Sequence, residues 1–250
     1  MTLAESTQHT IIIAFLLLTG CSHHVPQATV EVIDTSASIT TRAEKSALVA
    51  IQNQIAHMQR GDRLVLIPVT GDEANDAGGR ILRFSAPIER ETYDADLHRF
   101  QEQARMQFAA WVASLDKHQS RTDIFGALDA AQQEFAVPPK DSNRRLIILS
   151  DFLEDDGTYR FVSAGSLTNP VRARELAARL RQQHGFTVPG APLCLGRLES
   201  SDFAPLSAQR KEAIQAFWSA YFGAGGQLTE IRFDGTGILA DAERGCGGGK

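Results

Sequence analysis

The chain has 250 residues, of which 43% are hydrophobic and 22% charged, and its formal net charge is -5 at pH 7. This composition is that of a globular protein, and the length suffices to bury one sizeable core. No run of Lys and Arg stands out, so charge and sequence together argue against a nucleic-acid-binding protein. We expect one domain of about 200 residues, with two smaller domains as the alternative.

Residues 1–20 differ in character from the rest of the chain. Ile11–Leu18 is an uninterrupted apolar run. It is too short to cross a bilayer, which takes about 20 residues, and its length is typical of the apolar core of a secretory signal peptide. The sequence LTGC, Leu18–Cys21, follows directly and resembles the lipobox of bacterial lipoproteins. The resemblance implies cleavage before Cys21 and attachment of lipid to this cysteine.

This interpretation makes residues 1–20 a signal peptide and residues 21–27 a lipidated tether. It predicts a protein of the bacterial cell envelope, lipid-anchored at the periplasmic face or the outer membrane, with a soluble secreted or periplasmic protein as the alternative. One feature disagrees, because the opening MTLAESTQHT contains Glu5 and no Lys or Arg, whereas export signals normally begin with positive charge. A buried helix or strand of an ordinary globular protein is therefore the competing interpretation.

From residue 28 onward, buried strands alternate with amphipathic helices. Apolar runs such as ATVEVID and RLVLIPV predict strands. Leu48, Ile51 and Ile55 recur at the spacing of one helical face and predict a helix. In chain order, the first half is predicted to hold a strand over 28–34, a helix over 41–60, a strand over 62–69, a loop of turn formers, an alternating edge strand over 80–86 and a helix over 94–118.

The second half continues the alternation. Asn169 and Pro170 supply a helix cap and a first-turn proline, and Gly185 stands beyond the end of that helix. Because the strands are continuous apolar runs between helices, we predict an α/β fold with a mainly parallel sheet covered by helices on both faces. The remaining elements are predicted as a helix over 124–135, a strand over 144–151, the helix that opens at Pro170, a strand over 191–196, a helix with its apolar stripe over 214–222 and a strand over 228–233.

Oxygen-bearing side chains stand where two of these strands end. Asp34, Ser36 and Ser38 follow the first strand, and Asp151 follows the strand that ends in LIILS. Thr122 stands in the loop before the helix at 124. Sites in open α/β sheets form at the carboxyl ends of strands, and hydroxyl and carboxylate oxygens are hard ligands that suit Mg²⁺ or Mn²⁺ better than zinc. These residues are therefore predicted to form one metal site.

The same arrangement resembles the metal-ion-dependent adhesion site of the von Willebrand factor type A domain. That family carries Asp-x-Ser-x-Ser after its first strand, a Thr in a loop before a helix, and an Asp after its fourth strand. The resemblance covers residues 28–233 and implies a doubly wound, Rossmann-like sheet with one antiparallel edge strand, for which residues 80–86 are available. It places the domain over residues 28–240 and leaves residues 241–250 as a flexible, glycine-rich tail.

The resemblance also implies a role for each residue of the site. Ser36 and Ser38 would bind Mg²⁺ or Mn²⁺ directly. Thr122 would bind directly or through water, while Asp34 and Asp151 would act mainly through water and hydrogen bonds. Since two carboxylates balance the charge of one dication, the ion would stay electrophilic and could accept an acidic side chain from a protein partner.

Three features near the site depart from the pattern or add to it. Phe152 follows Asp151 where many family members have Gly, which puts the surface around the metal in doubt. Asp123 is interpreted as the cap of the helix at 124, with added negative charge at the metal as the alternative. The run Glu154–Asp156 is interpreted as a solvated acidic loop, with a second ion as the alternative.

The chain contains three cysteines. Cys21 would be consumed by lipid, Cys194 lies in the apolar run APLCLG as a small core residue, and Cys246 lies in the glycine-rich tail. Pairing of Cys194 with Cys246 in an oxidising compartment stays open. No spacing of Cys and His indicates zinc.

Together these features favour a lipid-anchored binding module that engages a protein partner through Mg²⁺, rather than an enzyme. The catalytic alternative is a phosphohydrolase of haloacid-dehalogenase type with Asp34 as nucleophile. Such an enzyme needs a second acid two residues on, where this chain has Ser36. Neither a Ser-His-Asp arrangement nor a phosphate-binding glycine loop is present in the sequence. A structural domain with an empty metal site is the third possibility.

Overall fold

The computed structural model describes residues 24–71, 80–88, 94–115, 121–136, 141–186, 193–223 and 233–234. The predicted signal peptide, Cys21 and the glycine-rich tail lie outside these residues. In chain order the elements are β1 (Gln27–Asp34), α1 (Thr41–Ala56), β2 (Arg63–Val69), β3 (Leu82–Ser85), α3 (Asp94–Ser114), α4 (Ile124–Phe135), β4 (Asn143–Ser150), the 3-10 helix η1 (Gly165–Thr168), α5 (Pro170–Gln183), β5 (Leu193–Arg197), α6 (Ala208–Gly223) and β6 (Phe233–Asp234).

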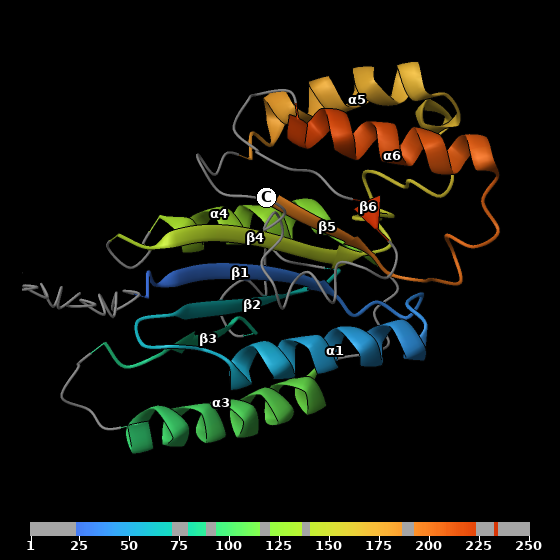
Figure 1. Ribbon diagram of the computed structural model, residues 1–250. Coiled ribbons are helices and arrows are strands. Elements are labelled where there is room, and N and C mark those ends of the chain that lie inside the picture. The colour runs from blue at the N-terminus through green and yellow to red at the C-terminus, as the bar shows by residue number, and fades with distance from the viewer. Residues whose placement is uncertain are drawn as a thin grey trace, which may run out of the picture.

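The strands form one sheet in the order β3-β2-β1-β4-β5-β6. Neighbouring strands are parallel except for β3, which pairs antiparallel with β2 at one edge (Figure 1). The predicted fold class is therefore confirmed: a doubly wound, mainly parallel sheet with one antiparallel edge strand. The segment 80–86 supplies that edge, as the sequence predicted.

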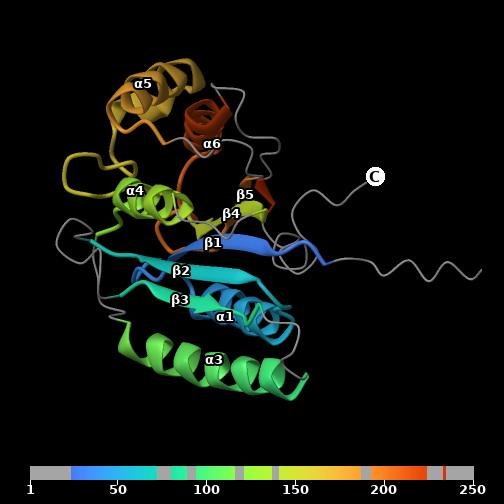
Figure 2. The ribbon, with the colours of Figure 1, turned by 90° about the vertical axis from the view of Figure 1, so that its left-hand side faces the viewer.

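Helices cover both faces of the sheet, as Figures 1 and 2 show. Successive side chains of a strand point to opposite faces, so β1 contributes to two cores. Val30 and Val32 pack in the core under α4, α5 and α6, whereas Ile33 packs in the core under α1 and α3. Because strands buried on both faces must be apolar throughout, the continuous hydrophobic runs in the sequence follow directly from this arrangement.

The differences from the predicted elements lie mainly at helix ends. The helix predicted over 41–60 ends at Ala56, because the backbone N–H groups of His57 and Met58 bond to carbonyls three residues back, those of Gln54 and Ile55, and Gly61 then turns the chain with a φ of 79°. The helix predicted over 94–118 is described to Ser114, followed by residues that lie partly outside the described set. Element η1 has no counterpart among the predicted elements.

Cys194 is a buried residue of β5, as predicted, and it is disulfide-bonded. The other two cysteines of the chain, Cys21 and Cys246, lie outside the described residues. None of the helices in the described part of the chain combines the length and the apolar character needed to cross a membrane.

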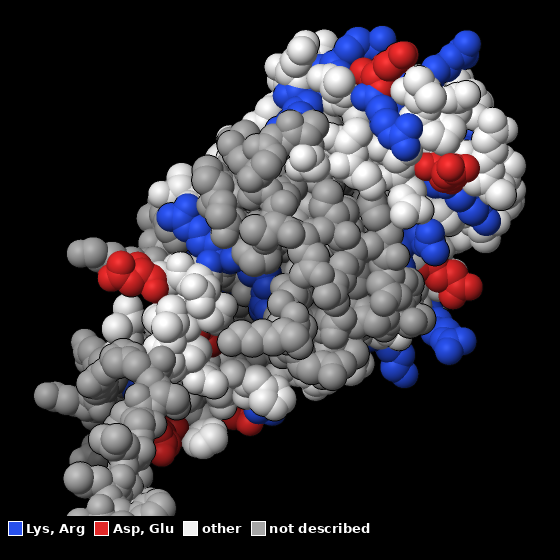
Figure 3. Space-filling view, turned by 45° about the horizontal axis from the view of Figure 1, so that its top comes forward, with Lys and Arg blue, Asp and Glu red and all other residues white. Residues whose placement is uncertain are grey.

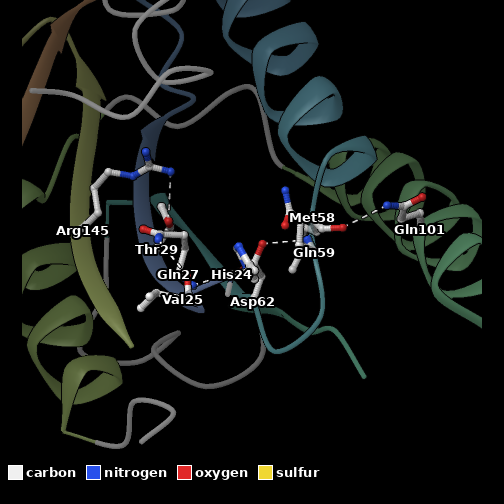
Figure 4. A network of polar contacts seen from close by, with 9 residues as sticks. All are labelled: His24, Val25, Gln27, Thr29, Met58, Gln59, Asp62, Gln101 and Arg145. Atoms are coloured by element: carbon white, nitrogen blue, oxygen red, sulfur yellow. Dashed lines mark hydrogen bonds and ion pairs between the residues drawn. The ribbon is translucent and has the colours of Figure 1, made fainter. Parts of the chain in front are cut away.

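The amino edge of the sheet is held by the carboxylate of Asp62, at the start of β2 (Figure 4). Its Oδ1 lies 2.7 Å from Nε2 of His24 and accepts the backbone N–H of Gln27 at 2.9 Å. Its Oδ2 accepts the backbone N–H of Gln59 at 2.7 Å. Both oxygens of Asp62 thus have donors within the protein, and the entry of the chain into β1 is fixed.

The opposite, carboxyl edge contains the point where the winding of the sheet reverses, between β1 and β4. Ile33 is in register with Leu149, so the next residues, Asp34 and Ser150, come side by side. Crevices at such switch points are the usual place for ligands in open α/β sheets. The fold therefore brings the first and fourth strand ends of the predicted site to one location.

Candidate functional site

Asp34 is the anchor of the carboxyl edge. Its side chain is buried, with Oδ1 accepting the backbone N–H of Ser36 at 2.9 Å and Oδ2 accepting the hydroxyl of Ser150 at 2.7 Å. The first bond holds the loop after β1 in a turn, and the second joins that loop to the end of β4. Ser150 in turn accepts the backbone N–H of Phe152 at 2.9 Å. Asp34 therefore shapes the loops on both sides of the switch point.

A chain of hydroxyl and carboxylate oxygens runs across this edge. The hydroxyl oxygens of Ser36 and Ser38 lie 3.1 Å apart, and the hydroxyl of Ser38 donates to Oδ2 of Asp151 at 3.2 Å. Oδ1 of Asp151 accepts the backbone N–H of Leu153 at 2.9 Å. Four of the five residues predicted for the metal site are thus linked, directly or through Ser150, into one group of oxygen ligands.

The two carboxylates of this group disfavour each other's ionisation. Burial and, second to it, the neighbouring Asp34 carboxylate raise the pKa of Asp151 to about 7, against the opposing effect of the hydroxyls of Ser200 and Ser38. Burial likewise raises the pKa of Asp34, although the bonds from Ser150 and Ser36 act in the opposite direction. Without a cation, the pair is therefore poorly suited to carry two negative charges at neutral pH.

Thr122, the fifth predicted residue, lies in the loop before α4. Its backbone N–H donates to the carbonyl of Asp155 at 3.0 Å, and its carbonyl accepts the N–H of Asp155 at 2.8 Å. Asp123 donates its N–H to the carbonyl of Thr70, just beyond β2. These bonds fix Thr122 at the carboxyl edge beside the loop that begins with Asp151. They do not place its hydroxyl at the other four residues, so its contact with an ion stays a prediction.

Phe152 occupies a backbone conformation that favours glycine. Its φ is 62°, in the left-handed region, which costs a residue with a side chain about 1–2 kcal/mol. The ring is buried against Trp218, with centroids 5.8 Å apart, and the Trp218 indole N–H donates to the Phe152 carbonyl at 3.0 Å. Burial of a phenylalanine side chain contributes roughly 1.5–3 kcal/mol and offsets the strain. The departure from Gly is therefore accommodated by an aromatic core behind the site.

Sequence reasoning missed the loop after β5. Ser200 is buried and its hydroxyl lowers the pKa of Asp151, while Ser201 donates its backbone N–H to the carbonyl of Ser38 at 2.8 Å. Ser150, the last residue of β4, was also missed as the partner of Asp34. Small hydroxyl residues at the end of β4 and in the loop after β5 were the available signal, because β4 neighbours β1 at the switch point and β5 is the next strand of the sheet.

A second acidic group lies beside the first. Asp123 caps α4 as predicted, its Oδ1 accepting the N–H of Gly126 at 2.7 Å. Asp123, Glu154 and Asp156 each offer one carboxylate oxygen, and these oxygens lie within 4.8 Å of one another. The interpretation of Glu154 as part of a solvated loop is wrong, because its side chain is 0% exposed. Burial raises the pKa of Glu154 well above its ordinary value, and the carboxylates of Asp123 and Asp156 raise it further.

A hollow beside Asp151 carries positive charge. Its lining includes Asp151 and Phe152 together with Arg197 and Lys211. The guanidinium carbon of Arg197 lies 4.9 Å from the ring centre of Phe203, and the ammonium nitrogen of Lys211 lies 5.4 Å from the same point. The shared ring holds two cations next to the oxygen ligands, an arrangement that attracts an anionic group.

No protein-family model and no curated protein matches the chain. Among solved structures, an aerotolerance-related membrane protein from Bacteroides fragilis, with multiple mutations to serines, is 13% identical with a TM-score of 0.44, and the match covers 88% of this chain and 95% of that one. A von Willebrand factor type A protein from Catenulispora acidiphila is 17% identical with a TM-score of 0.44, and the match covers 88% of this chain and 41% of that one.

The pilus adhesin SpaC from Lactobacillus rhamnosus GG is 11% identical with a TM-score of 0.43, and the match covers 88% of this chain and 29% of that one. This chain thus spans less than half of the second and third proteins. TM-scores of this size carry no argument about function, and the fold class rests on the strand order and register described above.

Proposed function

We propose that the chain is a lipid-anchored module of the bacterial cell envelope that engages a protein partner through a Mg²⁺ ion, with Mn²⁺ as an equivalent. The observation that carries this proposal is the chain of oxygens from Ser36 through Ser38 to Asp151, beside buried Asp34 at the switch point. The ligands are all hard oxygens, and two buried carboxylates, neither with an ion-pair partner among the described residues, supply the charge that a dication neutralises.

Each residue of this set has a distinct role toward the ion. Ser36 and Ser38 would bind it directly, and Thr122 would complete the set from the loop before α4. Asp34 and Asp151 would balance its charge and hold its water molecules. The bound ion supplies an electrophilic centre that can accept a carboxylate from a partner. This assignment follows the likeness to the adhesion site of von Willebrand factor type A domains.

The surface beside the site supports an acidic partner. Arg197 and Lys211 line the hollow next to Asp151, so a second anionic group on the same partner would meet two cations there. Figure 3 shows Lys and Arg side chains outnumbering acidic ones over the end of the molecule formed by α5 and α6. Charges of this kind speed the encounter with an acidic surface more than they strengthen the final complex.

The chain enters the sheet at the edge opposite the proposed site, and this arrangement supports a site that faces away from the membrane. β1 spans 8 residues from Gln27 at the amino edge to Asp34 at the carboxyl edge. This length separates the two edges by about 25 Å. With a lipid anchor at Cys21, the network around Asp62 would face the membrane and the oxygen group would face the partner. The disulfide at Cys194 fits the oxidising environment outside the cytoplasm.

The anchor has its own test. Replacing Cys21 by Ala should move the protein from the membrane fraction to the soluble fraction, or leave it uncleaved, and should abolish incorporation of labelled palmitate. Cys246→Ala serves as the control and should keep the label. Absence of label from the wild-type protein would show that the anchor is wrong while leaving the ion site open.

We also propose that the protein lacks catalytic turnover. A dehalogenase-type phosphohydrolase needs a general acid two residues after its nucleophile, and Ser36 occupies that position and bonds to Ser38. A phosphatase activity that co-purifies with the protein, requires Mg²⁺ and disappears in Asp34→Asn would refute this part of the proposal.

The partner and the metal dependence can be tested together. The full chain is used to capture proteins from envelope extract in Mg²⁺ and in chelator, alongside Ser36→Ala and the control Ser46→Ala, an exposed serine of α1. We expect a partner that is retained in Mg²⁺, is lost in chelator and is depleted by Ser36→Ala alone. Capture that is equal in Mg²⁺ and chelator would contradict the proposal.

A further inference from the structure

The loop that follows β4 carries acidic residues that the proposed function does not use. One carboxylate oxygen from each of Asp123, Glu154 and Asp156 lies within 4.8 Å of the other two. Asp123 belongs to the start of α4, whereas the other two belong to the loop after β4. Two segments that are distant in the sequence therefore converge on one point with three acids.

Glu154 distinguishes this group from an ordinary acidic surface. Its side chain is 0% exposed, and its Oε2 accepts the backbone N–H of Ile124 at 2.9 Å. Its Oε1 is buried and has no hydrogen-bond partner among the described residues. A buried carboxylate oxygen without a donor is costly to the fold, and a cation at the centre of the group would remove that cost.

The three carboxylates lack an ion-pair partner among the described residues, although the His184 ring opposes the rise in the pKa of Asp123. In the part of the chain that the structure describes, no Lys, Arg or His side chain forms an ion pair with any of them. Asp155, which lies between Glu154 and Asp156 in the sequence, instead points its Oδ1 at Nε of Arg160, 3.6 Å away. The loop thus pairs one of its acids and leaves its two neighbours for another cation.

We propose that Asp123, Glu154 and Asp156 form a binding site for a divalent cation of the calcium class. Three carboxylates, with no nitrogen or sulfur ligand beside them in the described part of the chain, select a hard cation. Asp123 and Asp156 are half-buried, which leaves access for water to complete the coordination. Ligands drawn from a loop and a helix start suit the variable, higher coordination of Ca²⁺ better than the strict octahedron of Mg²⁺.

A cation at this site would stabilise the edge that carries the proposed Mg²⁺ site. It would join the start of α4 to the loop after β4, where the backbones of Thr122 and Asp155 already pair. This link would fix the positions of Thr122 and Asp151 at the edge that carries the proposed Mg²⁺ site. The cation site itself does not depend on the proposed function, because none of its ligands belongs to the group of Asp34, Ser36, Ser38, Thr122 and Asp151.

The test measures thermal unfolding and Ca²⁺ titration of the full chain in detergent. Glu154→Gln keeps an oxygen for the Ile124 N–H and removes the charge. Asp155→Asn is the matched control in the same loop, outside the cluster. We expect Ca²⁺ to bind the wild type and the control with a Kd of about 0.1–1 mM and Glu154→Gln at least about tenfold more weakly. In chelator, Glu154→Gln should melt no lower than the wild type, since it removes an uncompensated charge.

Saturating Ca²⁺ should raise the Tm of the wild type and of Asp155→Asn by about 3 °C or more, so that both exceed Glu154→Gln. Asp34→Asn separates this site from the first one, because it should keep the Ca²⁺ response while losing the Mg²⁺ response. No Ca²⁺ binding by the wild type would overturn the inference. So would an equal Ca²⁺ response in Glu154→Gln and Asp155→Asn, or a response lost in Asp34→Asn but kept in Glu154→Gln.

Discussion

The two edges of the sheet treat their buried aspartates in opposite ways. At the amino edge, the protein surrounds Asp62 with donors, the ring of His24 and the backbone N–H groups of Gln27 and Gln59 (Figure 4). At the carboxyl edge, the carboxylate of Asp34 raises the pKa of Asp151. All three aspartates accept hydrogen bonds, so the comparison concerns charge: the fold sets a histidine ring beside the acid that serves as a structural link, and sets two acids beside each other where we propose that a cation binds.

The largest expected effect comes from removing the structural aspartate. Asp62→Ala leaves two backbone N–H groups without their acceptor and should lower the free energy of unfolding by about 2–4 kcal/mol. Because Asp62 lies far from the proposed ion, urea unfolding should show the same loss in Mg²⁺ and in chelator. Asp96→Ala, at a partly exposed position of α3, should stay within about 0.5 kcal/mol of the wild type. A loss at Asp62 that depends on Mg²⁺ would break the comparison.

Glu31 is an intermediate case, a buried acid with a cation near it. Burial raises its pKa from 4.5 to about 7, against the opposing effect of the Arg145 guanidinium. A carboxyl whose pKa is higher in the folded state stabilises the fold relatively most below about pH 4.5. Its contribution then declines as pH rises and levels off above about pH 7, a total change of up to about 3 kcal/mol.

Glu31→Gln isolates that contribution. Urea unfolding between pH 4.5 and 8 should show a smaller decline in stability for Glu31→Gln than for the wild type, with the two curves separating above about pH 5. Parallel curves would mean that Glu31 is not the titrating group.

At the carboxyl edge the expected effects follow the charge that each substitution removes. Asp34→Ala should weaken Mg²⁺ most, because Asp34 also holds the turn at Ser36 and the hydroxyl of Ser150. Asp151→Ala removes a balancing charge and should weaken Mg²⁺ by about 10–100-fold, whereas Ser36→Ala removes one neutral ligand and should cost less. Mg²⁺-dependent shifts in Tm measure this order. An effect of Ser36→Ala larger than that of Asp151→Ala would contradict it.

The smallest effect concerns the hollow beside the site. Arg197→Ala should weaken capture of an acidic partner by about 1 kcal/mol, mainly through slower association and with less sensitivity to salt. Arg172→Ala, an exposed arginine of α5, is the control and should leave association unchanged. Equal effects of the two substitutions would show that general positive charge, and not the hollow, attracts the partner.

The fold could be predicted from the sequence because hydrophobic periodicity and turn residues determine locally where helices and strands form. The parallel strands, the edge strand over 80–86 and the capping of α4 by Asp123 were all predictable in this way. The bonds of Ser150, Ser200 and Ser201 were not, since they depend on which strands become neighbours in the sheet.

The burial of individual polar side chains also could not be predicted from the sequence. The sequence does not distinguish Glu154 from the two acidic residues that follow it, yet Glu154 is fully buried and Asp155 pairs with Arg160. The positive φ of Phe152 could be suspected only because glycine is the usual residue there, and its compensation by Trp218 comes from a helix 66 residues away. Such contacts are set by tertiary packing, which local patterns do not encode.

The central claim is that one divalent ion binds at the carboxyl edge, and calorimetric titration of the full chain with Mg²⁺ tests it most directly. We predict a single binding event at pH 7 in the wild type, abolished in Asp34→Ala and kept in Asp62→Ala. Because the pKa of Asp151 is raised to about 7, binding should also release a proton, seen as a heat that depends on the buffer. Absence of Mg²⁺ binding by the wild type, or unchanged binding in Asp34→Ala, would contradict the account.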